Sequence, residues 1–229
     1  MRAYFMLAIS WANAIRANLP LTHRRWQAES APLMTTAAGA SVTAGVSHLN
    51  ERGGMWDVAE IRRRLADKAT ADPGLTKFGA DIHRYDLAAP LTPDHVEGFE
   101  SRYGVRLPDS YREFLLTVGD GGAGPGYGIY NLDGPAMQQP HIDDWCRLDG
   151  FLATPFPHQA YWNDNADDDY EDPWQAAGAL PIGTLGCTMD MVLVVTGAAR
   201  GQVWMDDRGA DGGLTPQSDF QTWYLEWLG

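Results

Sequence analysis

Six acidic residues crowd one short segment, and carboxylates are the side chains best suited to bind a metal ion or to move protons. They are Asp164, Asp167, Asp168, Asp169, Glu171 and Asp172. An EF-hand calcium loop needs oxygen ligands at alternating positions, glycine at the sixth and glutamate at the twelfth. A loop starting at Asp164 would place Ala166 third, and one starting at Asp167 would place Gly178 twelfth. The spacing therefore favours a solvated acidic loop over a calcium site.

Aromatic side chains lie within and beside this acidic segment. Tyr170 lies among the acids, with Tyr161, Trp162 and Trp174 close by. Aromatic residues surrounded by acids can anchor a basic partner at the surface, or they can attach a long loop to the hydrophobic core. We take the six acids together with Trp162 and Tyr170 as candidate partner-binding residues.

Histidine and cysteine, the other residues that commonly do chemistry, do not form a recognisable site. The two cysteines, Cys146 and Cys187, are far apart, which excludes a CxxC pair. The histidines lack zinc-ligand spacing and are His23, His48, His83, His95, His141 and His158. The sequence also has no GxSxG nucleophile motif. We expect no catalytic residue, metal or cofactor; a carboxylate hydrolase stays a weaker alternative, because no spacing selects an acid–base pair.

The segment Gly119–Gly124 matches the pattern G-x-G-x-x-G. A dinucleotide site needs this loop after a strand and before a helix, so that the helix N-terminus meets the phosphates. Here the expected order is reversed, and Asp120 would place a negative charge beside them. We therefore interpret the segment as a turn from a helix to a strand.

Charge limits the class of partner. The 229 residues carry a formal charge of −13, with +3 in residues 1–54 and −16 in residues 55–229. A nucleic-acid binder needs a basic surface, so this balance argues against one and favours a basic protein partner. No apolar run approaches the length of about 18 residues that a membrane span requires, so we expect none. The oligomeric state stays open.

The first 54 residues differ in composition from the rest. Residues 31–54 are rich in Ala, Thr, Ser and Gly, which predicts a poorly ordered extension or linker. The first twenty weakly resemble a signal peptide, with Arg2 before a short apolar stretch. Alternatively, the functional protein starts at Met55, where dense patterning begins. We expect residues 55–229 to form the domain, with an acidic insert at about residues 137–179.

Apolar spacing predicts four helices in this domain. The first covers residues 56–69, and the second begins after Thr92 as N-cap and stops at Gly104. Pro108 opens a third, whose apolar face predicts one continuous helix to Val118. The fourth lies at the C-terminus, where Ser218 and Gln221 have capping-box spacing.

Strands are expected between and after these helices. Short strands are predicted at residues 77–85 and 129–132. The continuous apolar run at residues 191–196 is typical of a central buried strand. A short glycine-bounded connection then predicts a hairpin with residues 202–205.

Two separated blocks resemble the SUKH superfamily, which includes the fungal Smi/Knr-type regulators. The first has a helix ending in G-x-x-L-P at residues 104–108, then Tyr-x-x-Phe-Leu at residues 111–115, then a Gly-Gly turn. The second has Leu-Pro-Ile-Gly at residues 180–183, the apolar strand, and a C-terminal aromatic helix. The resemblance covers the chain from about Trp56 onward, apart from the acidic insert.

The resemblance implies a fold and a class of function. The fold is α+β, or mixed α/β: one domain with a largely antiparallel sheet and helices packed against it. Many bacterial members look like cytoplasmic immunity proteins, which bind and neutralise a cognate toxin without catalysis. We expect this function, with a toxin domain as partner and an acidic surface as contact. The alternative is a regulatory scaffold in cell-envelope synthesis or signalling, like the fungal relatives.

Overall fold

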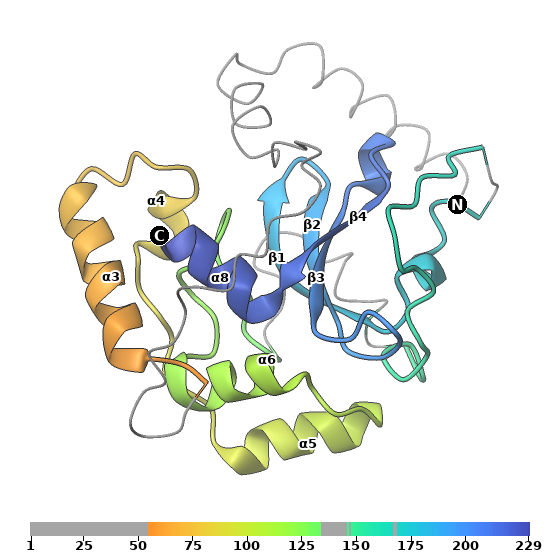
Figure 1. Cartoon of the computed structure of the whole chain (residues 1–229), viewed down its shortest axis with the longest axis horizontal. Coiled ribbons are helices and arrows are strands. Elements are labelled where there is room, and N and C mark those ends of the chain that lie inside the picture. The colour runs from red at the N-terminus through yellow and green to blue at the C-terminus, as the bar shows by residue number, and fades with distance from the viewer. Residues whose placement is uncertain (1–54, 134–145, 147, 167–168) are drawn as a thin grey trace, which may run out of the picture. The chain divides into compact units, whose positions relative to one another are not determined.

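A four-stranded antiparallel sheet forms the centre of the described structure (Figure 1). The structure is a computed structural model, and it describes residues 55–133, 146, 148–166 and 169–229. Each strand pairs with the next one in the chain; the strands are β1 (Ala179–Gly186), β2 (Met189–Val194), β3 (Gln202–Asp206) and β4 (Leu214–Asp219). β2 is buried along its whole length, which confirms the predicted central strand and its hairpin with β3.

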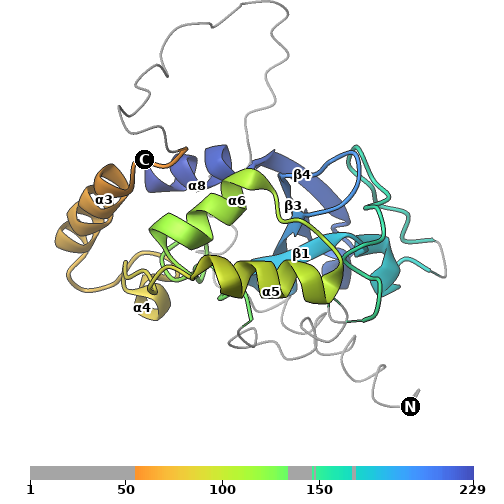
Figure 2. The same ribbon diagram turned by 90° about the horizontal axis from the view of Figure 1, so that it is seen from below.

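Two of the helices lie at the end of this domain opposite the acidic segment (Figures 1 and 2). The helices are α3 (Val58–Ala71), α4 (Ala80–His83), α5 (Pro93–Tyr103), α6 (Asp109–Glu113) and α8 (Phe220–Leu228). In both views α3 and α4 lie at one end and residues 148–166 and 169–178 at the other, with the sheet between them (Figures 1 and 2). The predicted α+β fold with an antiparallel sheet is therefore confirmed.

An aromatic cluster joins the helices to one another. The Trp56 ring lies edge-on to the rings of Phe114, Phe220 and Tyr224, with centroid separations of 5.4, 5.9 and 5.8 Å. The Trp56 indole N–H donates to the carbonyl oxygen of Ser110 at 2.8 Å, which satisfies its one polar group. These contacts attach the start of α3 to α6 and α8.

The helix signals in the sequence are confirmed at α5. The Thr92 hydroxyl accepts a hydrogen bond from the backbone N–H of His95, and Pro93 occupies the first turn. Gly104 ends the helix with φ at +65°, a conformation that glycine adopts without a Cβ penalty. The C-terminal helix is also confirmed, but its N-cap is Asp219 and not Ser218, because Asp219 Oδ1 accepts from the N–H of Thr222.

The strand predicted at residues 77–85 is wrong, since this segment holds the single helical turn α4. Gly79 enters the turn with φ at +75°, and Arg84 and Tyr85 leave it with positive φ. The buried Asp72 carboxylate accepts hydrogen bonds from the backbone N–H groups of Thr76 and Lys77 just before the turn. These local contacts outweigh the loose alternation of apolar residues.

Three further elements differ from expectation. The third helix divides into α6 and a π-helical turn, η1 (Phe114–Val118), although its predicted apolar face is buried as expected. Residues 129–132 form no strand; Ile129 makes isolated bridges to Gly122 and Gly183 instead. β4 was not predicted, because its sequence is mostly polar and includes Pro216.

Candidate protein-interaction face

The acidic loop lies at the surface. Asp164, Asp169 and Glu171 are exposed, whereas Asp172 is half-buried. Asp172 has a structural role, because its Oδ1 accepts from the N–H of Trp174 at 2.9 Å and caps the 3₁₀ turn η2 (Pro173–Ala176). Asp167 and Asp168 lie outside the described residues.

The two candidate aromatic residues point toward the protein interior. Tyr170 is only 4% exposed, and the half-buried Trp162 stacks on His158 with a centroid separation of 4.6 Å. Trp162 also packs against Tyr170 at 5.3 Å and forms a backbone bridge with Leu214. Of the two alternatives that the sequence left open, the structure favours attachment of the loop to the core for these two rings.

Their neighbours Tyr161 and Trp174 are the aromatic residues that this segment exposes. Their exposed fractions are 57% and 44%. Trp174 rests on the buried Phe151 at 5.4 Å, and the Tyr161 hydroxyl accepts from the side-chain amide of Asn163. A large, partly supported aromatic side chain at the surface is the residue type that most often dominates a protein interface.

Arg208 organises the loop, and the sequence reasoning missed it. It is 5% exposed and pairs with Asp206 through two hydrogen bonds, from Nε at 2.9 Å and from Nη2 at 2.7 Å. Its Nη1 donates to the carbonyl oxygens of Asp172 and Tyr170, at 2.8 and 3.3 Å. The buried guanidinium therefore attaches the acidic loop to the end of β3. In the sequence, the one indication of this role is that Arg208 is the single basic residue of the acidic stretch 206–211.

A second acidic segment lies beside the loop. Asp207 and Asp211 belong to the connection between β3 and β4, which contains the short turn η3 (Arg208–Ala210). Asn163 in the loop donates to the carbonyl oxygen of Asp211 at 2.9 Å. We call the loop 161–172 together with residues 206–213 the acidic face.

Basic side chains do not neutralise this half of the domain. Residues 148–229 contain 13 acidic residues and two arginines, Arg200 and Arg208, whereas residues 55–133 contain 13 acids and nine bases. Arg208 is buried, and Arg200 donates to the carbonyl oxygens of Arg106 and Leu107 beside α6. Both guanidinium groups are thus engaged within the protein, which leaves the acidic face with uncompensated negative charge.

The described histidines lie apart and have separate structural roles. His83 Nδ1 accepts from the N–H of Tyr85, and burial lowers the pKa of His83. Burial also lowers the pKa of His158, whose Nε2 donates to the Gln175 carbonyl oxygen at 3.1 Å. His95 contacts the Asp133 carboxylate at 2.8 Å at the surface. Within the described ranges, no three His, Cys, Asp or Glu side chains form a group that could hold a metal ion.

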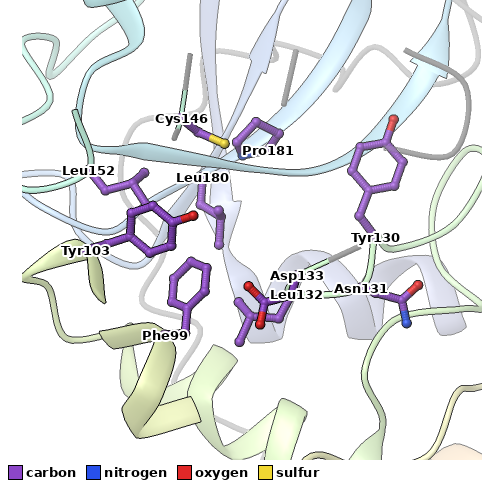
Figure 3. Close-up of a pocket in the computed structure, with 10 residues that line it drawn as sticks. All are labelled: Phe99, Tyr103, Tyr130, Asn131, Leu132, Asp133, Cys146, Leu152, Leu180 and Pro181. Carbon is purple, nitrogen blue, oxygen red and sulfur yellow. The ribbon is translucent and has the colours of Figure 1, made fainter. Parts of the chain in front are cut away.

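The cavity between α5 and β1 is too small for a substrate. Phe99 and Tyr103 from α5 point toward Leu180 and Cys146 (Figure 3). Its volume of about 20 Å³ holds little more than one water molecule.

The glycine-rich segment forms a turn, as predicted. It follows η1, and Gly121 and Gly122 have φ of +83° and +101°. Gly122 bridges Leu87 and Ile129 through backbone hydrogen bonds, and the described residues that come next, 123–133, hold no helix. The arrangement lacks the helix N-terminus that a dinucleotide phosphate would need.

The fold and the face together define an α+β domain that presents a negatively charged surface. Comparison with protein families matches residues 90–226 to the SMI1 / KNR4 family (SUKH-1). The chain therefore belongs to this family, in agreement with the resemblance drawn from the two sequence blocks. Searches among curated proteins and among solved structures gave no match. Among the described residues, no helix has the length and apolar character to cross a membrane.

Proposed function

We propose that this chain is a non-catalytic, cytoplasmic immunity protein that binds and neutralises a cognate bacterial toxin through its acidic face. Family membership supports a SUKH-type domain, and the resemblance described above connects such domains with toxin neutralisation. The observation that carries the choice of surface is the excess of acid in residues 148–229, whose two arginines both bind groups of the domain itself.

The charge also suggests what kind of toxin is bound. A toxin that attacks nucleic acid must present a basic surface to the phosphate backbone. An acidic protein can occupy that surface in place of the substrate, and long-range attraction speeds the encounter. The same charge makes nucleic acid itself an unfavourable partner for this chain.

The test measures binding to the toxin domain encoded by a neighbouring gene. One variant removes three exposed charges from the acidic face, with the changes Asp164→Asn, Asp169→Asn and Glu171→Gln. The matched control removes three exposed charges from α3, α4 and α5, with Asp67→Asn, Asp81→Asn and Asp94→Asn. We expect the first variant to lower the association rate about tenfold or more and to reduce its salt dependence, while the control changes it much less.

Rescue of cells that express the toxin is the second measurement. Co-expression of the wild-type chain should restore growth, and the acidic-face variant should restore it less well. Equal binding by both variants would place the interface elsewhere on the domain. Failure to bind any neighbour-encoded toxin, with a host enzyme bound instead, would contradict the immunity role and support a regulatory scaffold.

A further inference from the structure

Asp190 is a buried acid in the central strand of the sheet. It lies in β2 and is 9% exposed. Its cross-strand neighbours are Thr184 in β1 and Asp206 in β3. A carboxylate in this position has lost most of its hydration, so it needs a cation or hydrogen-bond donors to remain ionised at low cost.

The surroundings of Asp190 supply only part of that compensation. Its Oδ1 has no hydrogen-bond donor among the described residues. The Thr184 hydroxyl lies within hydrogen-bond reach of the Asp190 carboxylate and partly stabilises its ionised form, but it also donates to the Met189 carbonyl oxygen at 3.0 Å. On the β3 side, the Arg208 guanidinium binds both oxygens of Asp206, and Asp207 adds a second carboxylate.

These groups favour the neutral form of Asp190. Burial is the largest cause, and the nearby carboxylates of Asp206 and Asp207 add to it; together they raise the pKa of Asp190 to about 7, against a partly opposing contact with Thr184. An aspartate in water titrates near pH 4. The Asp190 carboxyl group therefore changes its protonation state close to physiological pH.

We propose that Asp190 is a proton-controlled switch on the stability of the sheet end that carries the acidic face. When Asp190 carries its proton, its side chain is uncharged and adds no negative charge beside Asp206. Without the proton, Asp190 adds a third negative charge to those of Asp206 and Asp207, and Asp206 is the carboxylate that Arg208 binds while it also holds the acidic loop. Deprotonation thus weakens the end of the sheet to which the loop is attached. This goes beyond toxin binding, since the switch acts with or without a partner.

The direction of the pH effect follows from the raised pKa. The unfolded chain releases the Asp190 proton near pH 4, whereas the folded domain keeps it until about pH 7. Between these values the folded state binds more protons, so its stability falls as pH rises. Above about pH 7 both states are ionised, and the effect levels off.

The experiment compares unfolding of the wild-type chain and Asp190→Asn by urea from pH 5 to pH 9. Asp211→Asn removes an exposed charge from the same end of the sheet and is the control. The histidines are common to all three proteins, so differences between them isolate the substituted group. We expect the folding equilibrium constant of Asp190→Asn, relative to wild type, to rise at least about tenfold between pH 5 and pH 8. The ratio for the control should stay within about twofold.

The proposal would be overturned if the ratio of the folding equilibrium constants of Asp190→Asn and wild type changed with pH as little as the ratio for the control. A second measurement needs no variant that folds: carboxyl-carbon NMR can follow the titration of Asp190 in the wild-type chain. A midpoint near pH 7 would support the switch, and a midpoint below about pH 5 would refute it.

Discussion

Arg208 shows how one buried cation can position an acidic surface. It satisfies the Asp206 carboxylate and two loop carbonyl oxygens with one guanidinium. A planar group with five N–H donors suits this arrangement, and a lysine ammonium could not reproduce it. The acidic loop is therefore held by a positive charge that is buried in the domain, so a protein that binds the acidic face does not contact this charge.

Replacing Arg208 tests this role. Arg208→Met leaves Asp206 buried without its cation, so we expect a loss of about 3–5 kcal/mol in the free energy of unfolding, measured with urea. Arg106→Met is the control, because Arg106 pairs with Asp109 at the exposed surface and should cost less than about 1 kcal/mol. The double variant Arg208→Met, Asp206→Leu should recover part of the loss. Similar costs for both single variants would contradict the role given to Arg208.

Asp72 should make the domain sensitive to acid. Its carboxylate accepts from the backbone N–H of Thr76 at 2.8 Å and from the Tyr85 hydroxyl at 2.8 Å. These hydrogen bonds, led by that from Thr76, hold the pKa of Asp72 well below its usual range. A lowered pKa contributes stability above the unfolded value near pH 4, and this contribution is lost as pH falls further.

Asp72→Asn should therefore lower the urea midpoint at pH 7, with a deficit that shrinks below pH 4. Asp94→Asn, an exposed position in the first turn of α5, is the control and should show a much smaller change. A deficit for Asp72→Asn that stays constant from pH 7 to pH 2 would show that ionisation of Asp72 is not its source.

At the scale of elements, close backbone contacts determine the turn after η1. A Cβ on Gly122 would press against the carbonyl oxygen of Asp86 and lie 2.9 Å from the Leu87 Cα, and φ there is +101°. Gly98, within α5, has open space where a methyl group would lie, and its backbone is ordinary helix. Gly122 therefore lacks room for a side chain and has a backbone that favours glycine, whereas Gly98 has room for one and an ordinary helical backbone.

Alanine at each position gives opposite expectations. Gly122→Ala should destabilise the domain by about 1–3 kcal/mol, because it is strained and clashes with fixed backbone. Gly98→Ala should stabilise it by about 0.5–1 kcal/mol, since alanine restricts the unfolded chain and favours helix. Urea unfolding at pH 7 measures both. Equal effects would mean that the turn tolerates a side chain and that its geometry is not required.

For the whole molecule, the separation of charge between its two ends suggests how a partner docks. The acidic face attracts a basic surface from a distance, and the exposed Trp174 supplies apolar area at short range. Phe78 lies between α3 and α4 and is 42% exposed, so it is an aromatic control matched in exposure to Trp174.

Trp174→Ala should weaken toxin binding about tenfold or more, mainly through faster dissociation. Phe78→Ala should leave the affinity nearly unchanged. Surface plasmon resonance with the neighbour-encoded toxin domain would measure both rates, and circular dichroism would check that each variant is folded. Equal affinity of the two variants would exclude Trp174 as an anchor of the interface.

Local sequence patterns were sufficient for much of the fold. The apolar faces of α3 and α5, the caps of α5, the buried strand β2 and its hairpin with β3 each depend on residues close in the chain. The family blocks could be recognised for the same reason, because they consist of core and turn residues in a fixed order. For residues 77–85 a weak alternation of apolar and polar residues led to the prediction of a strand. Hydrogen bonds to the Asp72 carboxylate favour a helical turn there instead.

The sequence by itself determined the α+β class, the family and the excess of acid. Only the tertiary structure decided that Trp162 and Tyr170 turn inward, that Arg208 joins the loop to the sheet, and that Asp190 faces Asp206. Asn163 and Asp211 are 48 positions apart, and Arg208 and Tyr170 are 38 apart. Periodicity reports only neighbours within a turn or a strand, whereas these contacts form when distant segments are brought together by burial of the sheet.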